Sequence, residues 1–323
     1  MSRRLLLSLP GAAALPLAAR AQAWPSRPLT LIVPFAAGGN VDTVARLAAT
    51  ELGRRLGQPV VVENAPGAGG TIGTERAARA APDGHTLLLG VESPLAIAPA
   101  VTPAAVRYDP LTDFAALGML ASLPLVLLAR PNLPARNLPE FLDLGRRQVG
   151  GLTYGTSGTG TSLHLWGETI AQRAGLRLEH VPYRIAAQIP PDLIAGRLDL
   201  AVLSLTTARP LLRDGRVRGL AVSSAQPHPA IPEVPPLASL PVFAGLEMVA
   251  WQAVFAPATT PAAVQERLAT ELAAMLEDAG FRRQLDAAGM TPWPLPPRAV
   301  AALLREDAGR YAAIARAGGI RAD

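Results

Sequence analysis

The chain has 323 residues, a length that suits two domains of ordinary size better than one. Half of the residues are hydrophobic but only 4% are aromatic, so alanine and leucine carry the core, as is typical of helix-rich α/β proteins. All 30 basic residues are arginines scattered along the chain, so the net charge of +5 does not indicate a nucleic-acid partner. The absence of cysteine excludes disulfides and a lipid-modified cysteine.

The first 23 residues predict a cleaved export signal. Arg3 and Arg4 form a short positive region, and a proline-interrupted apolar stretch, 5–19, follows them. This stretch is too short to span a membrane, and cleavage is expected after Ala21 or Ala23. The arginine pair leaves twin-arginine export open beside the general route. We therefore expect the mature protein in the periplasm, with a net charge of +2 once the leader and its arginines are removed.

After the leader, apolar runs typical of strands alternate with amphipathic helical patterns, as expected for parallel βα units. Asp42 is the expected N-cap of the first helix, Gly57 its stop, and Thr260 the N-cap of the helix that follows it. The expected strands are 29–33, 59–64, 85–90, 123–129, 152–155, 178–183, 198–203 and 217–224. The expected helices are 42–56, 71–81, 138–148, 162–174, 187–195, 261–278 and 298–317.

The segment 226–241 contains six prolines and cannot form regular structure. We interpret it as a crossing between two bodies, with the outward crossing near 126. The expected organisation is a leader, 1–23, a discontinuous first lobe, 24–126 and 226–323, and a second lobe, 127–225.

The turn PFAAGGNVD, 34–42, lies between a buried strand and a helix. Such a turn presents backbone N–H groups at the positive end of the helix dipole, a geometry that binds anions. The turn lacks the signatures of a P-loop or a dinucleotide fold, so a carboxylate is a better guest than a phosphate. An ordinary strand-to-helix connection is the alternative. The small residues that would allow close approach are Ala36, Ala37, Gly38 and Gly39.

A second glycine turn, ENAPGAGGTIG, covers 63–73. Its glycines do not have dinucleotide-binding spacing, because Ile72 occupies the position of the third glycine. We therefore expect no cofactor. The turn is expected either to add a second wall of backbone amides or to serve only as a tight turn that needs positive φ.

A third turn, YGTSGTGTSLHL, 154–165, contains Ser157, Thr159 and Thr161, whose hydroxyls can donate to a carboxylate. His164 follows and is either a general base or, as we favour, a hydrogen-bonding group at a cleft mouth. The four histidines show no metal-type spacing, so no metal is expected. Other polar candidates follow later strands, where open α/β sheets bind ligands: Tyr183, Ser204 and Thr206.

Eight blocks of the chain, which include these turns, are distinctive: PSRPLTLIVPFAAGGNVDTVAR, VVVENAPGAGGTIG, APDGHTLLLG, YGTSGTGTSLHL, HVPYR, LIAGRLDLAV, RVRGLAVSS and AIPEVPPL. In this order they resemble the Bug family, the extracytoplasmic solute receptors of tripartite tricarboxylate transporters. The resemblance covers nearly all of the mature chain. It implies an α/β, two-lobed periplasmic binding protein fold of type II-like form, with two crossing strands between the lobes. The implied partners are a small carboxylate-bearing solute and the membrane permease subunits, and we expect a monomer.

The resemblance also implies a set of ligand-binding residues, in which the first two turns form a pincer around a carboxylate. Three positions depart from the family pattern: Asn40, which can still donate a hydrogen bond, His85, and Ile185, which makes the rim of the second lobe bulkier. The residues implied on the first lobe are Phe35, Ala37, Gly38, Asp42, Gly69 and Gly70, and those on the second are Ser157, Thr159, Thr161, His164 and Tyr183.

Two other functions remain open at this stage. A secreted hydrolase or isomerase would use the same cleft, although the sequence lacks a recognisable base–nucleophile or metal set. A sensory receptor would engage a signalling protein instead of a permease. The ligand is equally open: a dicarboxylate, an aromatic carboxylate, an amino acid or an uncharged amide. Asp42 is expected to hold a water or its helix N-terminus, or alternatively to accept a hydrogen bond from a ligand ammonium group.

Overall fold

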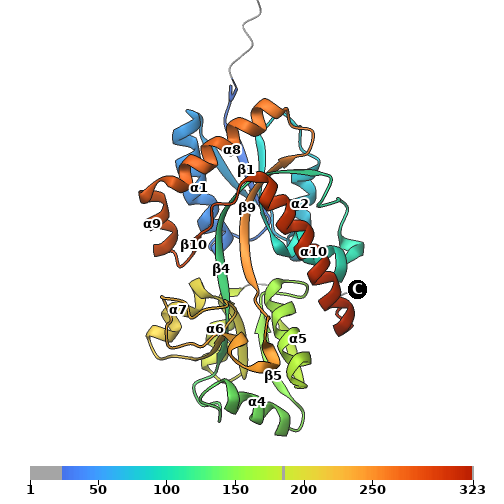
Figure 1. Ribbon diagram of the computed structural model, residues 1–323, viewed down its shortest axis with the longest axis vertical. Helices are drawn as coiled ribbons and strands as arrows, with labels where there is room; N and C mark the ends of the chain where they lie inside the picture. Colours follow the sequence, from blue (N-terminus) through green and yellow to red (C-terminus); the bar gives the residue numbers. More distant parts are fainter. Residues whose placement is uncertain (1–23, 184–185, 322–323) are drawn as a thin grey trace, which may run out of the picture.

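The computed structural model describes residues 24–183 and 186–321. They form two lobes stacked along the long axis of the molecule, joined by two long strands (Figure 1). The chain enters at the far end of lobe 1, and its last helix ends beside the junction with lobe 2. The predicted leader, 1–23, and Ile185 lie outside the described residues. Within the described part, no helix is both long and apolar enough to cross a lipid bilayer.

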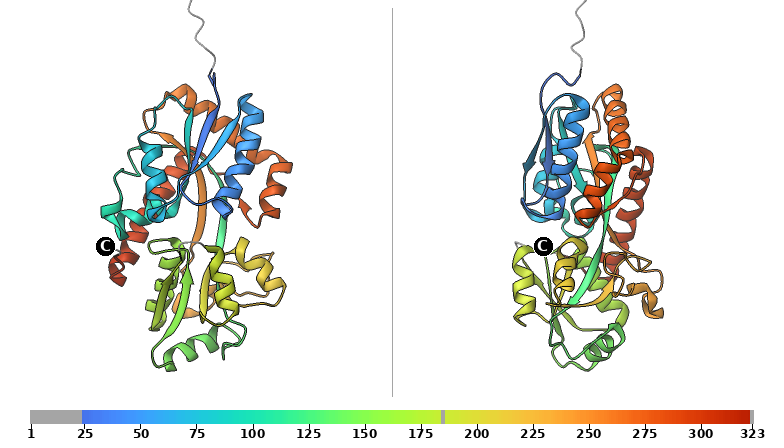
Figure 2. Two further views of the ribbon diagram at one scale, coloured as in Figure 1. Left: turned by 180° about the vertical axis from the view of Figure 1, so that it is seen from behind. Right: turned by 90° about the vertical axis from the view of Figure 1, so that its left-hand side faces the viewer.

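Lobe 1 is built on parallel strands β1 to β3, with helices on both faces (Figures 1 and 2). Here α1 contacts α8 and α9, whereas α2 and α10 lie on the other side in Figure 1. Its strands are β1 (Leu29–Val33), β2 (Val60–Asn64), β3 (Thr86–Val91) and β10 (Thr291–Pro292). Its α-helices are α1 (Asn40–Leu56), α2 (Thr71–Ala78), α3 (Ala98–Val101), α8 (Ala262–Glu277), α9 (Ala279–Ala287) and α10 (Pro297–Gly318).

Lobe 2 repeats the same principle with parallel strands β5, β6 and β7. The edge strand β8 pairs antiparallel with β4 (Phe114–Ala129), a long strand that enters this sheet from lobe 1. The strands are β5 (Leu152–Thr156), β6 (Leu178–Pro182), β7 (Leu200–Ser204) and β8 (Arg218–Val222). The helices are α4 (Leu138–Arg147), α5 (Ser162–Ala174), α6 (Ile189–Ile194) and α7 (Leu205–Arg213).

The two crossing strands are β4 (Phe114–Ala129) and β9 (Val249–Pro257), which pair antiparallel. Through them the two sheets form one ten-stranded sheet, in which β4 pairs with β9 in lobe 1 and with β7 and β8 in lobe 2. The outward crossing agrees with the expectation for 123–129, although β4 starts earlier.

The predicted return crossing at 226–241 is wrong. This proline-rich segment stays with lobe 2, where Pro236 bridges to Val222 and Ile231 and Val234 join the buried cluster. Proline has no N–H to donate to a sheet, so a strand that must pair with β4 cannot be built from this segment. The proline-poor run that starts at Val249 makes the crossing instead.

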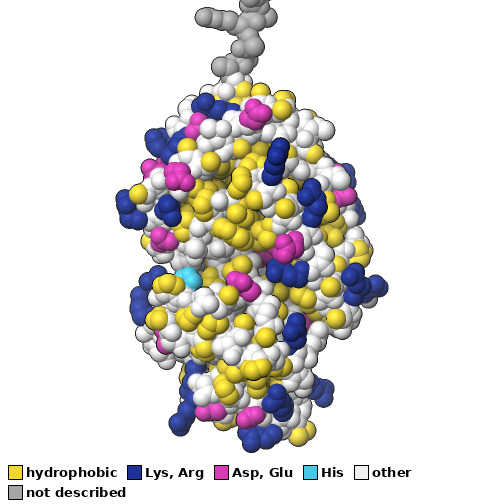
Figure 3. All heavy atoms as spheres, in the orientation of Figure 1, with side chains coloured by type: hydrophobic (Ala, Val, Ile, Leu, Met, Phe, Trp, Pro, Cys, Tyr) yellow, Lys and Arg dark blue, Asp and Glu magenta, His cyan; other side chains and the backbone are white. Residues whose placement is uncertain are grey.

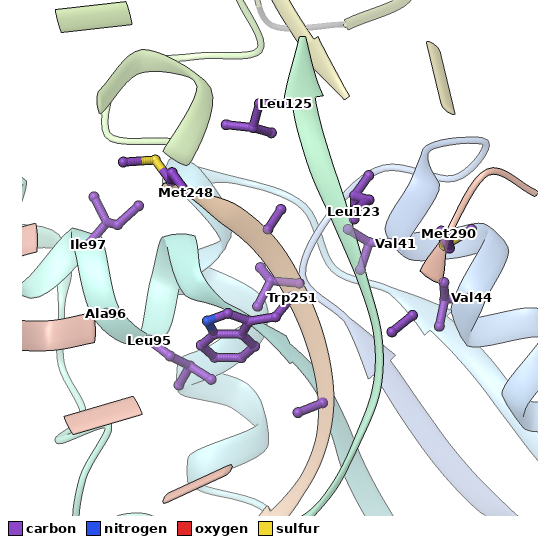
Figure 4. Packing of buried hydrophobic residues seen from close by; sticks show 14 of the residues in the cluster. Val41, Val44, Leu95, Ala96, Ile97, Leu123, Leu125, Met248, Trp251 and Met290 are labelled. Carbon is purple, nitrogen blue, oxygen red and sulfur yellow. The ribbon is translucent and has the colours of Figure 1, made fainter. Parts of the chain in front are cut away.

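A continuous apolar core extends through lobe 1, along the crossing strands and into lobe 2, where residues of α4 and α5 join it. In Figure 4, Trp251 of β9 lies beside Leu95, while Leu123 of β4 lies near Val41 of α1. A second buried cluster lies in lobe 2 between the sheet and helices α6 and α7. The crossing strands are therefore buried structural elements, because their side chains pack in the cores.

The structure corrects two expected helix starts. The N-cap of α1 is Gly39, not Asp42, and the N-cap of α8 is Pro261, not Thr260. The expected stop at Gly57 is confirmed, since this residue adopts the left-handed conformation that ends a helix. Helices α7 and α9 and strand β9 were not predicted.

Candidate functional site

A cavity of about 420 Å³ lies between the lobes, where the carboxyl ends of β1, β3, β5 and β7 converge. Ligands of open α/β sheets bind at this edge, and the volume falls within the usual range for small-molecule sites. The residues that line it are Phe35, Ala36, Ala37, Gly38, Gly39, Asn40, Val41, Val91, Glu92, Ser93, Leu125, Ser157, Thr161, Ser162, Leu163, Ala186, Ala187, Leu203, Ser204, Thr207, Ala250, Trp251 and Gln252.

The wall from lobe 1 is the turn between β1 and α1. The first helical hydrogen bond of α1 runs from the amide of Thr43 to the carbonyl of Gly39. The preceding amides, including those of Asn40 and Val41, therefore have no partner within the helix. Both residues line the cavity, so the positive end of the α1 dipole faces it.

Asp42 holds this turn in shape from behind. Its carboxylate accepts hydrogen bonds from the Gly38 amide at 2.9 Å, from Asn64 Nδ2 at 3.0 Å and from the Arg46 guanidinium at 2.9 and 3.0 Å. Burial opposes ionisation of Asp42, but these hydrogen bonds and the charge of Arg46 outweigh it and hold the pKa of the carboxyl below its ordinary value. Asp42 does not line the cavity, and the Gly38 amide is already occupied.

The wall from lobe 2 is the start of α5. The Thr161 side chain caps this helix, since its Oγ1 accepts from the amide of His164 at 3.3 Å and donates to the carbonyl of Gly158 at 2.9 Å. Ser162 and Leu163, in the first turn of α5, line the cavity. The positive ends of α1 and α5, from opposite lobes, therefore face the same space.

Two more polar groups enter the cavity from lobe 2 at the start of α7. The hydroxyl of Ser204 lies 2.8 Å from Oγ1 of Thr206 and 3.3 Å from Oγ1 of Thr207. Ser204 and Thr207 line the cavity. These hydroxyls can form hydrogen bonds either with each other or, after rotation, with a ligand.

Part of the cavity wall consists of the crossing strands, through Leu125 of β4 and Trp251 and Gln252 of β9. Glu92, at the end of β3, is 3% exposed, and its Oε2 accepts from the Trp251 amide at 3.1 Å. Burial raises the pKa of Glu92 to about 7, although hydrogen bonds with Ser162 and the Trp251 amide favour the ionised form. Among the described residues that line the cavity, Glu92 is the one with an ionisable side chain.

The structure brings together many, but not all, of the residues singled out from the sequence. The cavity is lined by Phe35, Ala36, Ala37, Gly38, Gly39, Asn40, Ser157, Thr161 and Ser204. It is not lined by Asp42, Gly69, Gly70, Thr159, His164 or Tyr183.

The second glycine turn supports the site from outside the cavity. A Cβ at Gly70 would lie 3.2 Å from Cζ of Phe35, so this glycine allows the Phe35 ring to pack against the turn. Gly69 adopts φ 65° and faces the carbonyl of Thr159 in lobe 2. Gly69 and Thr159 therefore lie near each other from opposite lobes but do not line the cavity.

His164 is buried behind the third turn and is not at a cleft mouth. Its Nδ1 accepts from the Gly160 amide at 3.2 Å, and its ring stacks on that of His180 at 4.0 Å between centroids. Burial lowers the pKa of His164 to about 4, so the ring is neutral near pH 7 and can accept this hydrogen bond. Tyr183 donates to Asp192 of α6 at 2.5 Å.

Sequence reasoning missed several lining residues for two reasons. Glu92 and Ser93 lie two and three residues after the expected strand 85–90, because β3 extends to Val91, so a strand-end rule with a slightly wider window would have found them. Gln252 and Trp251 lie on a strand that was not predicted, and the signal was one amide inside the apolar run VAWQAVF. Within the residues that the structure describes, no group of three or more His, Cys, Asp or Glu side chains could hold a metal ion.

Comparison with known proteins identifies the family. Residues 44–320 match the family model described as tripartite tricarboxylate transporter family receptor. A protein encoded in the tcbD–tcbE intergenic region of Pseudomonas sp. strain P51 is 37% identical over 91% of this chain and 87% of its own length. The periplasmic binding protein BugD has a structure that matches with a TM-score of 0.83 and 31% identity, over 92% of this chain and 99% of its own.

Two solved relatives from Rhodopseudomonas palustris contain ligands. Rpa4515 with adipate matches with a TM-score of 0.86 and 32% identity, over 92% of this chain and 99% of its own. MatC (Rpa3494) with bound malate matches with a TM-score of 0.81 and 32% identity, over 90% of this chain and 99% of its own. The resemblance to the Bug family and the two-lobed α/β fold are thereby confirmed: the chain belongs to the receptor family of tripartite tricarboxylate transporters.

Proposed function

We propose that this protein is an exported receptor that captures a small carboxylate-bearing solute between its lobes and delivers it to the membrane subunits of a tripartite tricarboxylate transporter. One observation carries the proposal: the N-termini of α1 and α5, from opposite lobes, line a single cavity. An anion placed there interacts favourably with both helix dipoles. Adipate and malate, the ligands in the two solved relatives, are carboxylates.

The same arrangement supports binding that favours closure. Lobe 1 supplies the turn 35–41 and lobe 2 supplies Ser157, Thr161 and Ser162. A solute that touches both walls stabilises the arrangement in which they are close, and β4 and β9 are the segments about which the lobes would move. The residues proposed to contact the solute are those that line the cavity other than Thr161, whose hydroxyl is used to cap α5. Thr161, Asp42, Gly70 and His164 support them.

We further propose that the solute leaves chemically unchanged, that the leader ending at Ala21 or Ala23 directs the chain to the periplasm, and that the receptor acts as a monomer. We also propose that nucleic acid is not a partner. On the face shown in Figure 3, basic and acidic side chains are interspersed and form no continuous basic patch.

The carboxylate site is tested by placing bulk at Gly38, which lines the cavity with φ +86°. Native mass spectrometry of freshly purified protein first identifies the solute. Gly38→Val should then weaken its binding at least tenfold in calorimetry, about 1.4 kcal/mol, because a β-branched residue disfavours this positive φ and would change the shape of the turn. The matched control is Gly215→Val, which also has positive φ but lies in lobe 2 away from the cavity. Equal affinity in wild type and folded Gly38→Val would contradict the site.

Closure has a separate test. Saturating solute should reduce the radius of gyration measured by small-angle X-ray scattering, and the solute recovered after long incubation should be intact. No change in the radius would exclude closure, and a modified product would instead favour an enzyme.

A further inference from the structure

Gln252 has a buried amide without a protein partner. The residue is 1% exposed and lines the cavity from strand β9. Neither its Oε1 nor its Nε2 has a hydrogen-bond partner among the described residues. An unpaired buried polar group costs about 1–3 kcal/mol, so a donor and an acceptor aimed into a cavity indicate that they serve a guest.

Glu92 directly follows β3, the strand that pairs with the β9 strand of Gln252. Residue Val91, immediately before Glu92, pairs in register with Gln252. The Glu92 carboxyl is anchored by the Trp251 amide on β9. Glu92 and Gln252 thus come from the paired strands β3 and β9 and both line the cavity, and we call these two residues the polar patch.

The chemistry of this patch differs from that of the helix N-termini. The α1 and α5 termini offer donors, which suit a carboxylate. An ionised Glu92 offers only acceptors, and the Gln252 carbonyl oxygen adds another. A ligand ammonium group can bind to these acceptors, whereas a second carboxylate would meet a like charge in a site largely removed from water.

We propose that Glu92 and Gln252 form a subsite that binds an amino group on the solute, so that this receptor prefers amino acids to dicarboxylates of matched length. This inference rests on the proposed function, because the carboxylate of the same solute would occupy the amides at the α1 terminus. Gln252 assists with its carbonyl oxygen, and Glu92 supplies the charge that discriminates.

The test uses matched probes and isothermal calorimetry at pH 7.5. The six-carbon set is adipate, 6-aminohexanoate and 6-hydroxyhexanoate, and the four-carbon set is succinate, 4-aminobutanoate and 4-hydroxybutanoate. An aromatic set is terephthalate with its aminomethyl and hydroxymethyl analogues. In at least one set, the amino member should bind wild-type protein at least tenfold more tightly than the dicarboxylate, with the hydroxy member between them.

Variants then assign the preference to the two residues. Glu92→Gln should reduce the amino-to-dicarboxylate affinity ratio at least tenfold, Glu92→Asp should retain a preference of the same sign, and Gln252→Leu should weaken the amino member severalfold. The matched control is Glu168→Gln, because Glu168 is a partly buried carboxylate that accepts from Tyr154 and does not line the cavity. It should leave the ratio unchanged. Thermal melting establishes that each variant is folded.

The outcomes separate this inference from the proposed function. If the dicarboxylate of every set that binds does so at least as tightly as its amino partner, or if Glu92→Gln leaves the ratio unchanged, the amino subsite is overturned while carboxylate binding stands. If no carboxylate in the panel binds, both proposals are overturned.

Discussion

The two turns that face each other across the cavity are braced by different chemistry. The lobe 1 turn is held by an ionised carboxylate, Asp42, which is bonded to the Gly38 amide and to Arg46. The lobe 2 turn is held by a neutral imidazole, His164, which accepts from the Gly160 amide, and by the hydroxyl of Thr161. Similar glycine turns before similar helices can therefore be stabilised by charge in one lobe and by uncharged groups in the other.

The largest effect is expected at Asp42. Asp42→Ala removes the acceptor from the Gly38 amide, Asn64 and Arg46, and should lower the free energy of unfolding by about 2 kcal/mol, since hydrogen bonds to charged groups are worth about 1.5–3 kcal/mol. Solute affinity should also fall at least tenfold because the turn loosens. Urea denaturation and calorimetry measure the two effects. Asp42→Asn, which keeps one acceptor oxygen, should lose less stability than Asp42→Ala. Identical losses in the two variants would mean that the charge of Asp42 does not stabilise the turn.

A loss of stability comparable to that of Asp42→Ala is expected when the pH is lowered and His164 becomes protonated. Its pKa is about 4 in the folded protein and about 6.5 when unfolded, so the unfolded chain binds more protons between these values. The free energy of unfolding should therefore fall as the pH is lowered through this window, by up to about 1.4 kcal/mol per pH unit. His180, whose pKa burial and the charge of His164 lower to about 3, adds to the fall.

The measurement compares urea denaturation of wild type and His164→Asn at pH 7 and pH 5. Glu92 acts in the opposite direction here, because its raised pKa makes the folded state bind more protons below about 7. Since Glu92 is present in both proteins, the difference isolates the histidine. Wild type should lose about 2 kcal/mol more than the variant. Asp42 contributes only at lower pH, because its folded pKa lies below its ordinary value of 3.8. Equal losses of stability in wild type and His164→Asn would contradict the interpretation that a neutral His164 stabilises the lobe 2 turn.

The smallest effect is expected at Thr161. Thr161→Ala removes the N-cap of α5 and should lower the free energy of unfolding by about 1 kcal/mol, measured by urea denaturation. Its hydroxyl is already used within the turn, so solute affinity should fall by less than about fivefold. Thr161→Ser keeps the cap and should behave like wild type. A loss of affinity far beyond the loss of stability would mean that the hydroxyl binds solute directly.

The sequence was sufficient for the parallel βα units and the glycine turns because strong local patterns encode them. Burial on both faces makes β1 and β3 continuous apolar runs, and Gly57 must end α1 because it adopts positive φ. The prediction of the return crossing was wrong because a proline-rich stretch resembles a linker. Strand β9, which makes the crossing, is one apolar run among many in the sequence. The supporting roles of Asp42 and His164 depend on partners such as Asn64 and His180, which are distant in the sequence.

Local sequence patterns could predict only those cavity-lining residues that lie within a single segment of the chain. Ala36 to Gly39 were identified because a strand, a glycine turn and a helix stand in order, whereas Phe35 and Asn40 came from the family resemblance. Glu92 and Gln252 come from segments about 160 residues apart, and only the pairing of β3 with β9 brings them together. No local pattern encodes that pairing.

Because Gln252 and Trp251 belong to a strand that connects the lobes, the proposed solute site includes the connector itself. In a receptor whose connector lies remote from its guest, selectivity and the stiffness of the connection can change independently. Here an exchange at Gln252 alters a wall of the cavity and, at the same time, a strand that runs between the lobes. Variants selected for a new solute should therefore also acquire altered rates of capture and release, so that evolutionary change in specificity and in transport rate occurs together.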